Sequence, residues 1–216
     1  INILNVVDFM KKIRKKKQLE MAIQSIPPHP NPKVELEQYS TPAIIAADLL
    51  WNAYSLGDIE NSEIIDLGCG TGILSIGSLL LGAKKVTAVD IDEDSLAIAR
   101  LNSENLNIEY VCCDISDFNC SDSCDVVIQN PPFGSQKKSE RGADLKFIDK
   151  ARECSPGVIY SFHMASTEKF IIDYFKKSGF VVTHIFRYKF ILPKIYDFHT
   201  KESKEVDVIV IRAENI

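Results

Sequence analysis

The sequence predicts an α/β fold, with a mostly parallel sheet that carries helices on both faces. Three observations predict it. Short apolar runs of strand length alternate with helical patterns from residue 43 to residue 178. A glycine-rich turn joins the first of these strands to a helix. Two β-rich runs then end the chain without a helix between them, which predicts a closing antiparallel hairpin.

The first part of the chain is expected to form an arm. Asp8–Ile26 has a helical pattern with six cations within residues 11–17, and four prolines between residues 27 and 32 end it. A second helix is expected over Ala43–Ser55, because Thr41 is a good N-cap and Pro42 suits the first helical position. The sequence therefore predicts a basic helix and proline-rich connector over residues 1–33 and a main domain over residues 34–216.

Strand and helix signals alternate through the rest of the chain. The expected strands are Glu63–Leu67, Lys85–Val89, Ile108–Cys112, Asp125–Gln129, Gly157–Phe162, Val181–Ile191 and Glu205–Arg212. The expected helices between them are Gly72–Leu81, Asp94–Asn105, Asp144–Cys154 and Thr167–Ser178.

Length, composition and charge narrow the class of protein. With 216 residues, 45% of them apolar and 25% charged, the chain is expected to fold around one core. It contains no run of 18 apolar residues and no secretion signal at its start, so we expect a cytoplasmic protein without a membrane span. The net charge of −5, taken alone, argues against a nucleic-acid partner.

The six cysteines indicate no metal site. None forms a CxxC pair, and no pair of histidines follows at zinc spacing. We expect reduced cytosolic thiols, several of them buried. A disulfide or a metal site at Cys120 and Cys124 is the alternative, and nothing else in the sequence favours it.

The first chemical signal is the stretch Ile64–Gly72, an apolar strand that leads into three glycines at two-residue spacing. Glycine allows a tight turn and a close approach of a ligand to the main chain. This spacing is not GxGxxG, so no pyrophosphate cradle is expected. The next strand ends in Asp90, and an acid at this place can accept both hydroxyls of a ribose. A purely structural strand-to-helix turn is the alternative.

The second chemical signal is Asn130-Pro131-Pro132-Phe133, directly after a strand. Two prolines fix the backbone and remove amide donors, which leaves carbonyl oxygens as acceptors. Asn130 adds a side-chain acceptor, and Phe133 adds a flat face for a ring. An aromatic exocyclic amine needs this set, because two acceptors can hold its two N–H groups. The alternative is a proline-stiffened turn with Phe133 in the core.

Together, the two signals resemble class I methyltransferases that use S-adenosylmethionine and methylate amino groups. The resemblance implies a Rossmann-like fold with a seven-stranded sheet. It implies that Asp90 holds the ribose, that Asp114 contacts the adenine amine, and that Ile91 and Ile115 flank the adenine ring. A solvated loop acid is the alternative for Asp114. The tetrapeptide is shared by enzymes that act on adenine N6, guanine N2 or protein glutamine N5, so it does not separate these substrates.

Further motifs resemble the archaeal and eukaryotic methyltransferase-like family that makes N6-methyladenine in small-subunit ribosomal RNA. They are Leu36-Glu37-Gln38-Tyr39, Asp66-Leu67-Gly68-Cys69-Gly70, Asp90-Ile91-Asp92-Glu93-Asp94, Gly142-Ala143-Asp144, Tyr160-Ser161-Phe162-His163 and Phe198-His199. The match implies that Gln38, Tyr39 and Thr41 lie over the methionine end of the cofactor, with simple helix capping as the alternative for Thr41. It further assigns to the cofactor Asp66, Gly68, Gly70, Gly72 and Asn130. It assigns to catalysis Asn130, Pro131, Pro132 and Phe133.

The distribution of charge favours RNA contact, whatever the net value. Residues 1–40 hold seven cations and four acids, a net charge of +3, which leaves −8 for the rest. The expected RNA-binding residues are Lys11, Lys12, Arg14, Lys15, Lys16, Lys17, Lys137, Lys138, Arg141 and Arg187. A solvated basic helix is the alternative for residues 11–17. The family resemblance also implies a small zinc-ribbon activator protein that pairs with an edge of the sheet.

The sequence thus predicts an S-adenosylmethionine-dependent enzyme, without a metal, that methylates adenine N6 in structured RNA. Small-subunit ribosomal RNA is the expected substrate. Two rival hypotheses stay open. One is a protein glutamine N5-methyltransferase that acts on a release factor, and the other is a non-catalytic module that binds the cofactor or RNA.

Overall fold

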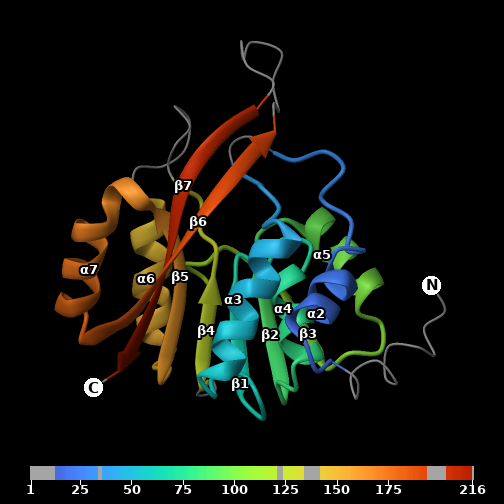
Figure 1. Ribbon diagram of the computed structural model, residues 1–216, viewed down its shortest axis with the longest axis horizontal. Coiled ribbons are helices and arrows are strands. Elements are labelled where there is room, and N and C mark those ends of the chain that lie inside the picture. The colour runs from blue at the N-terminus through green and yellow to red at the C-terminus, as the bar shows by residue number, and fades with distance from the viewer. Residues whose placement is uncertain (1–12, 34–35, 121–123, 134–141, 194–202, 216) are drawn as a thin grey trace.

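The computed structural model describes residues 13–33, 36–120, 124–133, 142–193 and 203–215. Their central feature is one seven-stranded sheet, with the order β3-β2-β1-β4-β5-β7-β6 (Figure 1). The strands are β1 Glu63–Leu67, β2 Lys85–Asp90, β3 Ile108–Cys112, β4 Val126–Gln129, β5 Val158–Met164, β6 Phe180–Pro193 and β7 Ser203–Asn215. Strands β3, β2, β1, β4 and β5 are parallel, and β7 is antiparallel to both of its neighbours. The Rossmann-like fold and its terminal hairpin are therefore confirmed.

Helices cover both faces of this sheet. They are α2 Lys16–Ile23, α3 Ala43–Ser55, α4 Ile73–Leu80, α5 Glu93–Asn102, α6 Ala143–Glu153 and α7 Glu168–Lys177, with a short 3-10 helix η2 Ala165–Thr167. Successive residues of a strand point to opposite faces. Ile64 of β1 accordingly packs with α2, α3 and α4, whereas Ile65 packs with α6 and α7. In Figure 1, α2 and α3 lie together over one half of the sheet, and α6 and α7 lie at the other.

The first described helix is shorter than the sequence predicts. Residues 8–12 of the expected helix Asp8–Ile26 lie outside the described residues. Within the described residues, α2 starts only at Lys16, after an extended Lys15. Leu19 and Ile23, four residues apart, are fully buried against the core. A short helix gains most of its stability from such packing, so the helix is confined to the residues around this apolar pair.

Thr41 does not cap α3. The N-cap position is held by Pro42 in an extended conformation, and no side chain makes a capping bond there. The expected range Ala43–Ser55 coincides with α3, and only the N-cap residue differs, since it is Pro42 and not Thr41. The Thr41 hydroxyl instead accepts a hydrogen bond from Asn130, a contact described below.

The cysteines also differ from expectation. Cys120 and Cys154 form a disulfide with their Cα atoms 5.1 Å apart, so the prediction of six reduced thiols is wrong for this pair. The bond joins the segment after β3 to the C-terminus of α6. Sequence spacing could not identify it, because the partners are 34 residues apart and meet only in the folded chain. Cys69, Cys112, Cys113 and Cys124 are free.

In the described part of the chain, none of the helices has the length and apolar character that a membrane span needs.

Candidate active site

A cavity of about 280 Å³ lies at the carboxyl ends of the parallel strands. Ligands bind at this edge in open α/β sheets. Eleven of the predicted site residues line it, namely Gln38, Tyr39, Thr41, Gly68, Gly70, Asp90, Ile91, Asp114, Ile115, Asn130 and Pro132. The four other described candidates for the cofactor and for catalysis, Asp66, Gly72, Pro131 and Phe133, do not line it.

The glycine loop closes one side of the cavity. Gly68, Gly70 and Gly72 all have positive φ angles, of 72°, 55° and 86°, which residues with a Cβ rarely adopt. A Cβ at Gly68 would also come within 3.0 Å of the Phe147 ring. The amides of Gly68 and Cys69 both donate to the carbonyl of Val89. These N–H groups are turned into the protein, so the loop presents a close main-chain wall with few donors for an anion.

Asp90 ends β2 and fixes this loop. Its Oδ2 accepts the Gly70 amide at 2.7 Å, and its Oδ1 accepts the Asp92 amide at 2.9 Å. Burial raises the pKa of Asp90, and the hydrogen bonds from these two amides offset part of that rise. Each carboxylate oxygen can accept more than one hydrogen bond, so a lining carboxylate held in this way can still take hydroxyl donors from a ligand.

Asp66 lies beneath the loop and away from the cavity. Its side chain is buried, and its Oδ2 accepts the Ser75 hydroxyl of α4 at 2.5 Å. Burial raises the pKa of Asp66 to about 7. The contact with Ser75 joins β1 to α4, and these are the two elements that the glycine loop connects.

Asp114, after β3, bounds another part of the cavity together with Ile115. Its Oδ1 accepts the amide of Ser116 at 2.9 Å, and the hydroxyl of Ser116 donates to the same oxygen. The Ser116 hydroxyl and amide lower the pKa of Asp114, so the group is a stable carboxylate at neutral pH. This arrangement holds an acceptor beside apolar side chains.

Asn130 stands at the end of β4 with its amide orientation fixed. Its Nδ2 donates to the buried Thr41 hydroxyl oxygen at 2.9 Å. With the amide nitrogen used in this way, Oδ1 is the atom left to accept from a ligand. Thr41 and Asn130 are 89 residues apart in the sequence and both line the cavity.

Phe133 is half-buried and has an aromatic partner. Its ring meets Phe190 of β6 edge-on with centroids 6.4 Å apart, and Phe190 in turn contacts Phe162 of β5. The C-terminal hairpin thus supports the aromatic residue of the tetrapeptide. Sequence reasoning did not anticipate Phe190, because its place in an apolar strand carries no sign of this contact.

Helix α6 supplies lining residues that the sequence analysis missed. Ala143, Lys146 and Phe147 border the cavity from its first turns. Their spacing of three and four residues is that of one helix face. This periodicity, shortly after the tetrapeptide Asn130–Phe133 in the sequence, is the signal that could have found them.

A chain of buried polar groups connects β4, β5 and α6 next to the site. The Gln129 amide donates to Ser161 Oγ at 2.9 Å, and Ser161 Oγ lies 2.7 Å from His163 Nε2. His163 Nδ1 lies 3.3 Å from Asp144 Oδ2. Because Ser161 Oγ accepts from Gln129, its own hydroxyl can donate a hydrogen bond to His163 Nε2. The ring proton of His163 then lies on Nδ1 and faces Asp144. Burial lowers the pKa of His163, in keeping with a neutral ring.

The predicted RNA-binding cations are only partly described. Lys11, Lys12, Lys137, Lys138 and Arg141 lie outside the described residues. Arg14, Lys15, Lys16 and Lys17 are exposed. Lys16 pairs with Asp48 at 2.6 Å, Lys17 with Glu20 at 2.8 Å, and Arg187 with Glu168 at 2.6 Å. Three of these cations therefore already have acidic partners within the chain.

Known proteins match this sequence and fold. The methyltransferase small domain family matches residues 45–156. The rRNA N(6)-adenosine-methyltransferase METTL5 of Danio rerio is 37% identical, with 92% of this chain and 98% of that protein covered. The chain belongs to the METTL5 family of methyltransferases. It is therefore a methyltransferase, and its cofactor is S-adenosylmethionine.

Archaeal proteins resemble this member of the METTL5 family as well. An uncharacterized protein of Methanocaldococcus jannaschii is 43% identical, with 94% of this chain and 95% of that protein covered. The crystal structure of protein PH1948 from Pyrococcus horikoshii is 40% identical and has a TM-score of 0.85, with 95% of this chain and all of that chain covered. The similarity extends over nearly the whole chain, beyond the glycine loop and the tetrapeptide.

Proposed function

We propose that this protein transfers the methyl group of S-adenosylmethionine to the N6 amine of adenine in small-subunit ribosomal RNA. The observation that carries the proposal is the orientation of Asn130, whose amide is turned by Thr41 so that Oδ1 is the open acceptor. The Danio rerio relative, named as an rRNA N(6)-adenosine-methyltransferase, supports the substrate class.

The lining of the cavity fits S-adenosylmethionine. Its carboxylates, Glu37, Asp90 and Asp114, suit a ligand that carries positive charge and hydroxyl donors. The glycine loop turns the amides of Gly68 and Cys69 inward and so offers little to a phosphate. In this assignment Asp90 accepts the ribose hydroxyls, and Asp114 accepts the adenine amine. The methionine end lies against the glycine loop and the wall from Gln38 to Thr41. Ile91 and Ile115 pack on the adenine ring.

When bound, the cofactor supplies an electrophilic methyl group on a sulfonium that already carries positive charge. The protein's task is to position the amine. Asn130 Oδ1 and the Pro131 carbonyl each accept one N–H group, which aims the nitrogen toward the methyl group. Phe133 stacks on the target base, a contact worth about 1–3 kcal/mol in single-stranded nucleic acids. Phe190 holds the Phe133 ring in place.

The basic residues support RNA as the substrate. We assign phosphate contacts to the cations of residues 11–17 and to Lys137, Lys138, Arg141 and Arg187, since phosphate contacts position RNA without reading its sequence. Arg187 would exchange its contact with Glu168 for a phosphate. The proposal includes a cytoplasmic location and a small zinc-ribbon activator protein along an edge of the sheet, as the family resemblance implies.

Methyl transfer to defined substrates tests this function. The protein is incubated with labelled S-adenosylmethionine in three separate reactions. Each reaction contains one substrate: small ribosomal subunits, protein-free RNA or release factor. Mass spectrometry then locates the label. We expect N6-methyladenine in the RNA. Asn130→Ala should lower the rate by about 100-fold or more, the effect of removing one positioned polar group, while cofactor binding is retained.

Asn102→Ala is the matched control, because Asn102 is exposed at the end of α5 and donates only to a helix carbonyl. It should transfer at the wild-type rate. Label confined to glutamine in the release factor would instead establish the protein-methylating alternative. Absence of label from all three substrates would favour a module that binds without catalysing, and a wild-type rate in Asn130→Ala would contradict the role given to Asn130.

A further inference from the structure

One wall of the cavity comes from a segment that precedes the sheet in the chain. We call residues 29–33 and 36–41 the strap. They connect α2 with α3, and the wall runs from Leu36 to Thr41. The described residues of the strap form no strand and no helix longer than one turn. Side-chain contacts therefore hold the strap against the rest of the domain.

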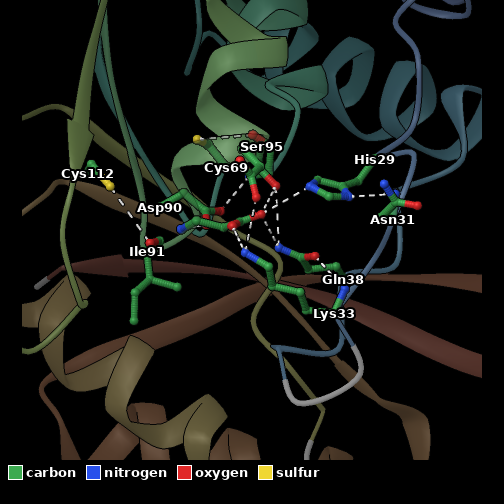
Figure 2. Close-up of polar contacts among 12 residues, drawn as sticks. His29, Asn31, Lys33, Gln38, Cys69, Asp90, Ile91, Ser95 and Cys112 are labelled. Atoms are coloured by element: carbon green, nitrogen blue, oxygen red, sulfur yellow. Dashed lines mark hydrogen bonds and ion pairs between the residues drawn. The ribbon is translucent and has the colours of Figure 1, made fainter.

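Three strap side chains meet at one acid of the body, Asp92. Gln38 Nε2 donates to Asp92 Oδ2 at 2.8 Å, and the Lys33 ammonium donates to Asp92 Oδ1. His29 Nε2 lies 3.2 Å from Oδ2 without the alignment of a hydrogen bond. The backbone amide of Asn31 donates to His29 Nδ1, so the ring carries its proton on Nε2, facing Asp92. Figure 2 shows His29, Lys33 and Gln38 converging beside Ser95.

On its other side, Asp92 belongs to the cofactor-binding body. It is the N-cap residue of α5, and the Ser95 hydroxyl donates to its Oδ2 at 2.9 Å. Its amide donates to Asp90 Oδ1 at 2.9 Å, and Asp90 is the acid assigned to the ribose. Asp92 therefore links Asp90, the acid assigned to the ribose, with the strap that forms part of the cavity wall.

The environment of Asp92 makes this link a strong one. Its side chain is only 2% exposed. Burial by itself would raise the pKa of Asp92, but hydrogen bonds from Lys33, Gln38 and Ser95 outweigh it and hold the pKa well below its usual range. A buried carboxylate that loses its cationic partner is costly, so the charged group keeps the strap closed over it.

A metal ion is not needed to explain the cluster. His29, Asp92 and Asp94 lie close enough together to share one. The Lys33 ammonium, however, already contacts both carboxylates and supplies the positive charge that they require.

We propose that Asp92 is a positioning residue for cofactor binding, which fastens the strap through Lys33 and Gln38 and so completes the wall of the cavity. The inference rests on the proposed placement of the cofactor in this cavity. Neither Asp92 nor Lys33 is among the described residues that line the cavity. Their effect on the cofactor must therefore be indirect.

The test compares Asp92→Asn and Lys33→Met in the full chain. The Asp92 side chain makes no capping hydrogen bond to α5, so Asp92→Asn removes the charge with almost no change of shape and removes no cap. Binding of S-adenosylmethionine is measured by titration calorimetry. We expect each variant to bind about tenfold more weakly, the size of effect expected when a buried charged contact is lost. The double variant should bind no more weakly than either single one, because all three break the same contact.

Amide hydrogen exchange without the cofactor gives a second readout. Residues 36–41 should exchange faster in both variants, whereas β5 and β7 should exchange as in the wild type. Asp94→Asn is the matched control. Asp94 also lies in the first turn of α5 and contacts Lys33, but its side chain is 76% exposed. This control should change neither the affinity nor the exchange.

Two results would overturn the proposal. One is wild-type affinity in both Asp92→Asn and Lys33→Met. The other is weak binding in Asp92→Asn alone, since Asp92 would then act through α5 and Asp90 and not through the strap. If the wild-type protein failed to bind S-adenosylmethionine, the proposed function would fall, and the exchange measurement would still decide whether Asp92 fastens the strap.

Discussion

The contact between Thr41 and Asn130 determines which side-chain atom Asn130, the asparagine proposed to be catalytic, presents to a ligand. An amide side chain offers a donor and an acceptor, and these exchange places when it flips. The Thr41 hydroxyl takes the Nδ2 donor, so Oδ1 is available for the target amine. A residue that sequence analysis assigned to the cofactor or to capping thus has a further task in the site.

This role predicts that Thr41→Val impairs transfer more than binding. Valine has nearly the same shape but cannot accept a hydrogen bond, so Asn130 loses its fixed orientation. We expect kcat to fall by about 10-fold or more, as for loss of a group that positions a reacting atom. Thr41→Ser, which keeps the hydroxyl, should restore most of the rate. Steady-state kinetics and calorimetric cofactor titration of both variants provide the measurement, and equal rates for the two would contradict the assignment.

At the scale of single residues, sequence patterns indicated polar side chains that line the cavity more readily than the residues that contact them. Asp90, Asp114 and Asn130 stand where strands end, which an apolar run followed by a polar residue reveals. Their partners do not follow from local patterns. Thr41 and Phe190 reach the site through tertiary contacts, and the sequence contains no local sign of such contacts.

At the scale of elements, strands were predicted more closely than helix ends. Glu63–Leu67 coincides with β1, because a buried parallel strand is a short apolar run with polar boundaries. Ile108–Cys112 coincides with β3, the edge strand, whose residues are only partly buried or exposed. Among the described residues, 13–15 and 24–26 lie outside α2, so the helix expected over residues 8–26 is shorter there than predicted, because the helical pattern of the cationic residues has no apolar face to bury. The spacing of Lys146 and Phe147 on α6 is a sequence signal that would have predicted them as residues lining the cavity.

The buried chain from Gln129 to Asp144 joins three elements, and it predicts a dependence of stability on pH. Burial lowers the pKa of His163 in the folded protein, whereas the unfolded chain has an ordinary histidine. Above about pH 6.5 the ring is neutral in both states. As the pH falls below that value, the unfolded state binds the proton first, so the free energy of unfolding decreases, by up to about 1.4 kcal/mol per pH unit.

Urea unfolding at pH 7.5 and pH 5.5 checks this dependence. The wild type should lose more stability between the two pH values than His163→Gln, which has no ring to titrate. The groups that face His163 are Ser161, the Phe175 ring and Asp144, and all are kept in that variant. His184→Gln, at an exposed position of β6, should lose as much as the wild type. Identical losses for His163→Gln and the wild type would refute the neutral buried ring.

For the whole molecule, the position of charge matters more than its sum. The net charge of −5 argued against a nucleic-acid partner, but the body carries the acids and the first 40 residues carry an excess of cations. The acidic body agrees with the lining of the cavity, which includes the carboxylates of Glu37, Asp90 and Asp114. One average value therefore hides two parts of the sequence with opposite net charge.

The C-terminal hairpin is fastened to the body by another buried ion pair. Arg212 of β7 donates from Nε and Nη2 to the two oxygens of Asp58, at 2.7 and 2.9 Å, and Tyr160 of β5 donates to the same carboxylate at 2.5 Å. Asp58 lies between α3 and β1 in the chain, so the contact joins this connection to β7, the last strand in the chain. The side chains of Arg212 and Asp58 are 6% and 9% exposed.

Removal of Asp58 should therefore destabilise the whole fold. Asp58→Ala leaves a buried guanidinium without its main partner, and loss of one member of such a pair costs about 3–5 kcal/mol. Glu214→Gln is the control, because Glu214 contacts the same guanidinium from a side chain that is 46% exposed, where an ion pair contributes below about 1 kcal/mol. Urea unfolding measures both. A comparable loss in the two variants would mean that burial does not set the strength of this contact.

The hairpin carries Phe190, which supports Phe133, so Asp58→Ala should also slow methyl transfer at temperatures well below its own unfolding.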